Sequence, residues 1–272
     1  MQKGKIWIVG AGPGGADLLT IKALKTIQQA DVILSDALIT DEIRSLFPEN
    51  SIVIDVGKRA GDGKNPMRRQ EYINDQMLMY YLLGSQVVRL KSGDPMIYGR
   101  GVEEIRFLLA SGLNFELIPD ISAGIAAANE FWIPLTERGK ASGIHFHSAI
   151  KMGGSKNNLH EIIREIEKGD TVVIYMGLEK LKEVSSELKQ RLSKETNINV
   201  VSKVSYKKSK VLSGNTKFFS RIETVDLPDS PAVIIIGNHT KIPENKMLEN
   251  KIAATFSHRL KSLVRQPFLN FL

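Results

Sequence analysis

The 272-residue sequence contains no cysteine. Without thiols a protein forms no disulfide, uses no thiolate nucleophile and binds no cysteine-ligated zinc or iron–sulfur cluster. Histidine is scarce as well, and of the five in the chain only His145 and His147 stand close together. No carboxylate or third histidine follows them at a typical metal-ligand offset. They are therefore interpreted as residues on the surface of a strand, and no metal site is predicted.

Long apolar runs are also missing. No run reaches the roughly 18 apolar residues of a membrane span, and the opening MQKGKIWIVG leads into a strand without a signal-peptide cleavage pattern. The protein is therefore expected in the cytoplasm, without a membrane partner. The formal net charge of +7 favours acidic ligands. No nucleic-acid partner is predicted, because basic residues interleaved with aromatics and known nucleic-acid modules are both absent.

Hydrophobic strands alternate with helical periodicity in the first half of the chain. Residues 5–10 (KIWIVG) and 31–36 (DVILSD) have the pattern of buried strands, and residues 17–30 between them carry apolar side chains at helical spacing. The alternation continues to a helical segment at residues 122–131 (SAGIAAANEF). This succession of strands and helices predicts an α/β fold with a largely parallel sheet.

The pattern changes near residue 140. Residues 202–208 (SKVSYKK) and 209–214 (SKVLSG) lie so close together that they are predicted to pair as a hairpin, which makes the second sheet mixed. We therefore expect an N-terminal α/β domain at residues 1–139, a C-terminal α/β domain at residues 140–242 and a basic tail at residues 243–272. The tail is expected to form a surface or dimer-packing helix rather than a membrane anchor.

The segment IVGAGPGGAD, residues 8–17, follows the first strand and has the glycine spacing of a dinucleotide-binding turn at Gly10, Gly12 and Gly15. Asp36 ends the second strand, where a dinucleotide-binding fold places the acid that binds a ribose hydroxyl. A nicotinamide oxidoreductase is therefore one hypothesis. Pro13 counts against it, because proline removes one backbone N–H from the loop that would bind phosphate.

A second loop of this kind, LKSGDPMIYGRG at residues 90–101, also follows a hydrophobic strand and precedes a helix. Because both loops end strands of one predicted parallel sheet, they are expected to share a ligand at its carboxyl edge. Asp94 precedes Pro95, which favours an extended backbone, and Gly93 leaves room for a ligand against the main chain. A carboxylate at this place suits a cationic or hydroxyl-bearing ligand better than a phosphate.

Seven segments then occur in the order and spacing of one family: VGAGPG, DLLTIKA, QQADVILSDALI, VGKRAG, RLKSGDPMIYGRGVEE, IPLTERG and VIYMGL. Over about residues 4–240 the sequence resembles the uroporphyrinogen-III C-methyltransferases of the tetrapyrrole methylase superfamily. The resemblance implies a homodimer of two α/β domains that binds S-adenosylmethionine in the cleft between the domains. It also implies methylation of two pyrrole carbons of uroporphyrinogen III, which gives precorrin-2 for sirohaem or cobalamin, with S-adenosylhomocysteine as the second product and no metal.

The resemblance assigns roles to individual positions. Asp36 and Lys58 fall on positions of proton transfer. The residues implied to bind the cofactor are Pro13, Ser92, Gly93, Asp94, Ile97, Ser122, Ala123, Met176 and Ala232. Because the substrate is a polycarboxylate, Arg59, Arg100 and Arg138 are candidates for binding it through bidentate pairs.

Several positions depart from the family pattern. Ser92 stands in place of the first glycine of Gly-Gly-Asp-Pro, Asp120 in place of the glycine of Pro-Gly-Ile-Thr, and Glu137 in place of the histidine of Pro-Leu-Thr-His-Arg. Most of the departures fall around the expected cleft. A second hypothesis is therefore a diverged relative with another tetrapyrrole-like substrate, or one that only binds its ligand.

Overall fold

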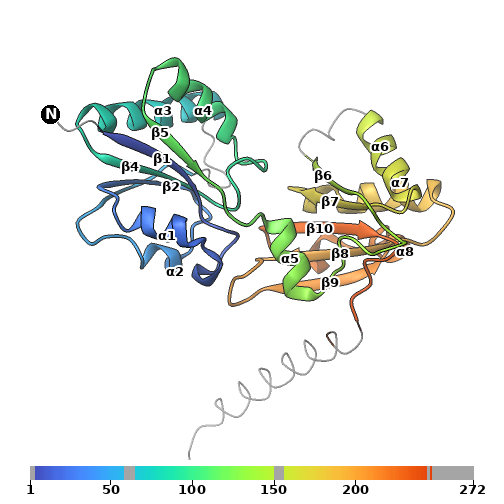
Figure 1. Cartoon of the computed structure of the whole chain (residues 1–272). Helices are drawn as coiled ribbons and strands as arrows, with labels where there is room; N and C mark the ends of the chain where they lie inside the picture. Colours follow the sequence, from blue (N-terminus) through green and yellow to red (C-terminus); the bar gives the residue numbers. More distant parts are fainter. Residues whose placement is uncertain (1–3, 58–64, 150–155, 244–245, 247–272) are drawn as a thin grey trace, which may run out of the picture.

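A computed structural model describes residues 4–57, 65–149, 156–243 and 246 of the chain. It contains two five-stranded sheets, each covered by helices, and Figure 1 shows them as two α/β units. Two of the predicted site residues, Lys58 and Arg59, lie outside the described residues, as does most of the tail. None of the helices in the described ranges is long and apolar enough to cross a membrane.

The first sheet has the strand order β3-β2-β4-β1-β5, and every adjacent pair is parallel. Its strands are β1 (Lys5–Gly10), β2 (Val32–Ser35), β3 (Ile52–Asp55), β4 (Gln86–Lys91) and β5 (Phe115–Ile118). A helix lies in each connection between successive strands, as the crossover between parallel strands requires. The predicted parallel sheet is confirmed.

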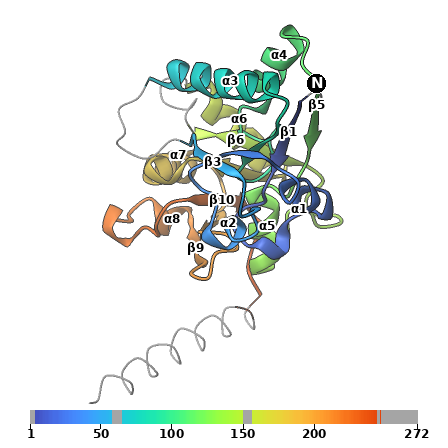
Figure 2. The same cartoon turned by 90° about the vertical axis from the view of Figure 1, so that its left-hand side faces the viewer.

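Helices cover both faces of the first sheet. They are α1 (Ile21–Ile27), α2 (Asp41–Arg44), α3 (Pro66–Leu82) and α4 (Gly101–Ala110). Figure 1 and Figure 2 show α3 on the opposite side of the sheet from α1 and α2. Side chains that alternate along β1 enter two separate cores: Val9 packs with α1 and α2, and Ile8 packs with α3 and α4. This alternation explains why the strand is apolar at nearly every position.

The second sheet has the order β6-β7-β10-β8-β9 and is mixed, as predicted. Only β6 and β7 run parallel, and the other neighbours are antiparallel. Its strands are β6 (Ile144–Ser148), β7 (Thr171–Tyr175), β8 (Asn197–Ser202), β9 (Lys210–Asn215) and β10 (Ala232–Gly237). The helices α6 (Lys156–Glu167), α7 (Leu181–Arg191) and α8 (Thr216–Phe219) supply the core on one face.

The other face of the second sheet is covered by α5 (Ala123–Phe131). Ala127 and Phe131 of this helix are buried with Val173 and Ile235 of the sheet. By its contacts α5 therefore belongs with the second sheet, although it precedes the expected division between residues 139 and 140. The division at that point stays a prediction.

The predicted hairpin between residues 202–208 and 209–214 is wrong in its first strand. The antiparallel pair consists instead of β8 and β9, and residues 203–209 form the connection between them. Tyr206 in this connection donates its hydroxyl to Leu38 O at 3.0 Å, and Ser205 N donates to Glu130 Oε2 at 2.9 Å. Contacts with distant parts of the chain thus fix a turn where the local pattern favours a strand.

Candidate active site

The loops that follow β1 and β4 touch through their backbones. Gly12 and Gly93 form an isolated bridge, in which Gly93 N donates to Gly12 O at 2.7 Å. Their φ angles are +62° and +69°, which glycine adopts without a Cβ clash. The expectation that the two loops meet at one edge of the first sheet is confirmed.

A cavity of about 250 Å³ lies beside this bridge and is lined by residues from both sheets. Every residue that the resemblance assigns to the cofactor lines it, and so does the carboxylate at the end of β2. These residues are Pro13, Asp36, Ser92, Gly93, Asp94, Ile97, Ser122, Ala123, Met176 and Ala232. The structure therefore brings together residues that lie far apart in the sequence, and their individual roles stay predictions.

A larger hollow of about 900 Å³ is lined by a different set that includes Ile121, Ile125 and Tyr206. None of the predicted site residues that the structure describes lines this hollow. The smaller cavity is the candidate site, because the bridged loops and every residue predicted to bind the cofactor are found there.

Two of the non-glycine residues with a left-handed backbone lie at the cavity. Tyr98 and Met176 both line it and have left-handed φ angles of 54° and 56°. Such a conformation costs a non-glycine residue about 1–3 kcal/mol, and it persists where the surrounding structure imposes it, often at functional sites. The side chain of Met176 is nevertheless about half exposed. The fold therefore presents a flexible apolar side chain to a ligand at an energetic cost.

Two tyrosines that the sequence analysis missed connect the sheets across the cavity. The hydroxyl of Tyr98 donates to Phe146 O at 2.6 Å, and the ring of Tyr98 lies 5.1 Å from that of Tyr175. The hydroxyl of Tyr175 contacts Ser122 Oγ at 2.7 Å and accepts from Gly124 N at 3.0 Å. Burial raises the pKa of both phenols, so both stay protonated at neutral pH. Each tyrosine is the sequence neighbour of a predicted site residue, Tyr98 of Ile97 and Tyr175 of Met176, and this could have identified them.

The carboxylate of Asp94 holds two loops in place. Its Oδ1 accepts from Met96 N at 2.8 Å, and its Oδ2 accepts from Asp120 N at 3.2 Å. Asp120 in turn accepts from Thr20 N at 3.2 Å. Burial, and to a smaller extent the charge of Asp94, raises the pKa of Asp120. Asp94 thus links the loop after β4 to the segment that enters α5.

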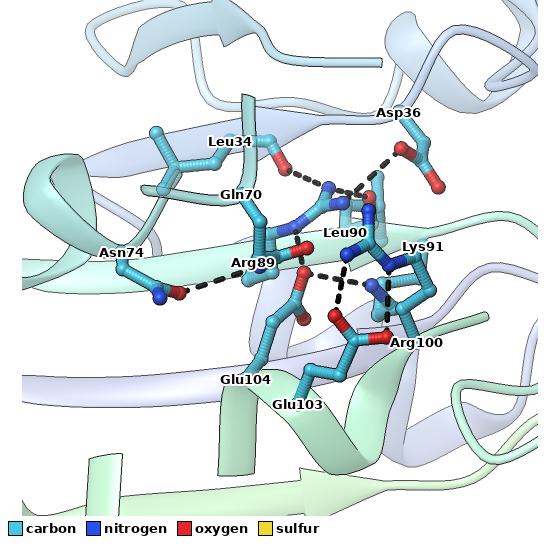
Figure 3. A network of polar contacts seen from close by, with 10 residues as sticks. All are labelled: Leu34, Asp36, Gln70, Asn74, Arg89, Leu90, Lys91, Arg100, Glu103 and Glu104. Carbon is cyan, nitrogen blue, oxygen red and sulfur yellow. Dashed lines mark hydrogen bonds and ion pairs between the residues drawn. The ribbon is translucent and has the colours of Figure 1, made fainter. Parts of the chain in front are cut away.

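Asp36 stands at the end of β2 with its side chain 30% exposed. Its Oδ1 accepts from Arg89 Nη2 at 3.1 Å, as Figure 3 shows. Burial alone would raise the pKa of Asp36, but the charges of Arg89 and Lys91 outweigh burial and hold this pKa below its usual value. Asp36 is therefore ionised at neutral pH. In the nicotinamide hypothesis this acid binds a ribose hydroxyl, whereas here it is paired with an arginine.

The arginines predicted to bind substrate do not line the cavity where the structure describes them. Arg100 stands at the start of α4, and its guanidinium pairs with Glu103. Arg138 is exposed in the turn before β6. Arg59 lies outside the described residues, as does Lys58. The roles of all four stay predictions.

The two histidines on β6 have carboxylate partners. His145 contacts Glu165 and Asp170, each at 3.1 Å, and His147 contacts Glu165 at 2.7 Å. In the part of the chain that the structure describes, no group of three or more His, Asp or Glu side chains could hold a metal ion. These pairs connect β6 to α6 and to the loop before β7.

Comparison with protein families adds independent information. The sequence profile described as Tetrapyrrole (Corrin/Porphyrin) Methylases matches residues 5–218. A siroheme synthase of Actinobacillus pleuropneumoniae is 35% identical over 268 residues, which cover 98% of this chain and 54% of the relative. The chain therefore spans about half the length of this relative. A chloroplastic S-adenosyl-L-methionine-dependent uroporphyrinogen III methyltransferase of Arabidopsis thaliana is 35% identical over 236 residues, covering 86% of this chain and 63% of that protein.

A solved structure shows the same architecture. Uroporphyrin-III C-methyltransferase from Thermus thermophilus, in complex with S-adenosylhomocysteine, is 31% identical and superposes with a TM-score of 0.70. The match covers 86% of this chain and 97% of the Thermus chain. Both described sheets thus have counterparts in a methyltransferase of known structure.

Proposed function

This chain belongs to the tetrapyrrole methylase family, and from that premise we propose that it methylates two pyrrole carbons of uroporphyrinogen III with S-adenosylmethionine as the methyl donor. The products are precorrin-2, an intermediate on the way to sirohaem or cobalamin, and S-adenosylhomocysteine. One observation carries the proposal: all the residues that the resemblance assigned to the cofactor surround a single cavity. The relatives named for this activity support it.

The residues at the cavity fit a ligand of this chemistry. A Cβ built on Gly93 meets no atom within 4 Å, so the main chain of this loop faces open space. The carboxylates of Asp36 and Asp94 suit a cationic group, and the exposed Met176 offers an apolar surface. When bound, S-adenosylmethionine supplies a methyl group that its sulfonium centre has already activated.

The contribution of the protein is therefore mainly to hold two reactants in line. Such positioning can lower a barrier by roughly 7–11 kcal/mol. We assign Pro13, Gly93, Asp94, Ile97 and Ala123 to the cofactor, together with the remaining residues of the cavity, Ser92, Ser122, Met176 and Ala232. The hydrogen bond from Tyr98 to Phe146 O ties the two halves of this site together.

Proton removal from the methylated ring needs groups near the substrate. We assign this role to Asp36 and Lys58. Because Asp36 is ionised at neutral pH, it stabilises positive charge that develops on the substrate and accepts a proton only from a strongly acidic group. The substrate is a polycarboxylate, for which we propose Arg59, Arg100 and Arg138 as binding residues.

The direct test is methyl transfer from labelled S-adenosylmethionine to uroporphyrinogen III by the 272-residue chain. We expect label in the tetrapyrrole and formation of precorrin-2. Asp36→Asn should bind S-adenosylhomocysteine nearly as well as the original protein but turn over more slowly. Well-folded protein that binds S-adenosylhomocysteine without methylating uroporphyrinogen III would instead support the diverged relative, to which the substitutions at Ser92 and Asp120 draw attention.

We also propose that the protein acts as a homodimer in the cytoplasm. The resemblance to the family supports the dimer, and Leu82, Leu83 and Leu109 are largely exposed apolar side chains that an interface could bury. Light scattering should give a molar mass near twice the 30.2 kDa of one chain. A mass of one chain at micromolar concentration would reject the dimer, and cell fractionation checks the location.

A further inference from the structure

A cluster of charged side chains lies buried behind the candidate site. Arg89 and Lys91 project from β4 toward Glu104 of α4, as Figure 3 shows. Arg89 Nε donates to Glu104 Oε1 at 3.0 Å, and Lys91 Nζ donates to the same oxygen at 2.9 Å. The side chain of Glu104 is 0% exposed, and those of Lys91 and Arg89 are 2% and 3% exposed. None of the three lines the cavity.

The charges in this cluster do not balance. Arg89 and Lys91 are two cations, and Glu104 is one anion, so one positive charge is in surplus. A buried charge without a counter-charge is strongly unfavourable. The carboxylate of Asp36 supplies the compensating negative charge, and its Oδ1 lies 3.1 Å from Arg89 Nη2. The cavity carboxylate therefore completes the charge balance of a cluster that is otherwise hidden from the ligand.

The hydrogen bonds of Glu104 support this interpretation. Both cations share Oε1, while Oε2 is buried without a hydrogen-bond partner among the described residues. A carboxylate placed only to connect α4 with β4 would gain from using both oxygens. Arg89 needs no help from Glu104 for its orientation, because its Nη1 also donates to Leu34 O and Leu90 O. Glu104 thus contributes mainly its charge.

We propose that Lys91 and Glu104 are positioning residues for the methyl-transfer site, which together with Arg89 set the charge of Asp36 at the cavity wall. Lys91 favours the ionised carboxylate, and Glu104 limits that effect by neutralising one of the two cations. The proposal rests on the proposed function for its catalytic consequence, but the effect on Asp36 itself is independent of that function.

Other titratable groups near the cavity do not provide this control. Asp94 accepts from backbone N–H groups of the two loops that it links, and Tyr98 and Tyr175 stay protonated at neutral pH. Glu103, the other carboxylate near Lys91, is paired with Arg100. Besides Arg89 and Lys91, the backbone of Ser92 lowers the pKa of Asp36 through a hydrogen bond. That bond is unaffected by a change of side chain at residue 91 or 104.

Two substitutions should change the pKa of Asp36 in opposite directions. Lys91→Gln keeps a donor for Glu104 Oε1 but removes a positive charge, so the pKa of Asp36 should rise by about one unit. Glu104→Gln keeps an acceptor but removes the negative charge, so the same pKa should fall. The measurement is a carbon NMR titration of protein labelled at its aspartate carboxyl groups, with Asp36→Asn to assign the signal. In the same variants, the pH below which methyl transfer declines should move in the same direction as the pKa.

Glu116→Gln is the matched control, because it also neutralises a glutamate that is paired with two cations but lies on β5, which β1 separates from β4. The pKa of Asp36 should not change in this variant. No rise in Lys91→Gln, or no fall in Glu104→Gln, would overturn the proposal. If Lys91→Gln does not fold, Lys91→Met replaces it with the same expectation. If the original protein does not methylate uroporphyrinogen III, the proposed function fails while the NMR titration still decides this inference.

Discussion

The central strands of the two sheets differ in what they bury. Each stands third in its sheet, β4 in the first and β10 in the second. β10 buries only apolar side chains such as Ile234 and Ile235, whereas β4 buries Arg89 and Lys91 along with its apolar residues. The parallel sheet with charges in its core also forms the bridged loops of the cavity.

We infer that the two strands contribute differently, β10 mainly to stability and β4 mainly to the charge of the cavity. An apolar core contributes free energy of folding that does not depend on the protonation of side chains. A buried charge cluster adds little net stability, and sometimes none. Removing one charged residue from it nevertheless destabilises the protein strongly, because the remaining charges lose their partner. The second sheet therefore supplies a stable support for the cavity, and the first sheet supplies the cavity with its charge. Substitutions in the two strands should behave differently with pH.

The largest effect is expected for Arg89→Met, which leaves Glu104 and Asp36 to share only Lys91. Removing one member of a buried ion cluster typically lowers the free energy of unfolding by about 3–5 kcal/mol. The lowered pKa of Asp36 means that its contribution to stability is complete above the unfolded-state value of about 3.9 and is lost as the pH falls through the lower folded-state value. The difference in the free energy of unfolding between Arg89→Met and the unsubstituted protein should therefore become smaller at acidic pH.

Urea unfolding at pH 7 and near pH 3 measures this effect. An equal loss of stability at both pH values would show that Arg89 contributes by packing rather than by charge.

Ile235→Ala on β10 should have the next largest effect. Ile235 is fully buried against α5 and β7, and truncation of such a side chain typically lowers the free energy of unfolding by about 2–5 kcal/mol. Because no charge is removed, the loss should be the same at both pH values in the urea experiment. A loss that varied with pH as it does in Arg89→Met would remove the distinction between the two strands.

Tyr175→Phe should have a smaller effect on stability and a clear effect on ligand binding. The change keeps the ring beside Tyr98 but removes the hydroxyl that binds Ser122 and Gly124. A lost hydrogen bond of this kind typically costs about 1 kcal/mol. Because Ser122 lines the cavity, calorimetry should show weaker binding of S-adenosylhomocysteine. Unchanged binding would show that the hydroxyl of Tyr175 does not support the ligand site.

The smallest effect is expected for Glu116→Gln, on the half-exposed end of the first sheet. Glu116 pairs with Lys5 and Lys22, whose hydrogen bonds lower its pKa to about 2. Exposed pairs contribute about 0–1 kcal/mol, so thermal unfolding should change by little at pH 7. That small contribution is present above the ordinary glutamate pKa and disappears as the pH falls toward 2. A larger loss would mean that surface pairs matter as much as the buried cluster.

The sequence predicts much of the fold because strand and helix periods are local properties. The two glycine loops could be placed at one sheet edge in advance, since both follow strands of a parallel sheet. The turn at residues 203–209 could not, because contacts of Tyr206 and Ser205 with other parts of the chain fix it.

The candidate site was predictable where the resemblance supplied positions, as for Pro13 and Ala232. The charge cluster was not, because Arg89 and Lys91 stand within a hydrophobic strand and Glu104 within an ordinary helix. Only the packing of α4 against β4 shows that these charges meet.

The central claim is that the cavity between the two sheets binds S-adenosylmethionine rather than a dinucleotide. Isothermal titration of the 272-residue chain with S-adenosylhomocysteine, and separately with NAD, tests it most directly. We predict a micromolar dissociation constant for S-adenosylhomocysteine. Gly93→Val should weaken this binding, because its side chain would enter the cavity and would also strain the left-handed backbone at this position. We also predict no measurable binding of NAD. Binding of NAD with no binding of S-adenosylhomocysteine would contradict both the cofactor assignment and the proposed methyl transfer.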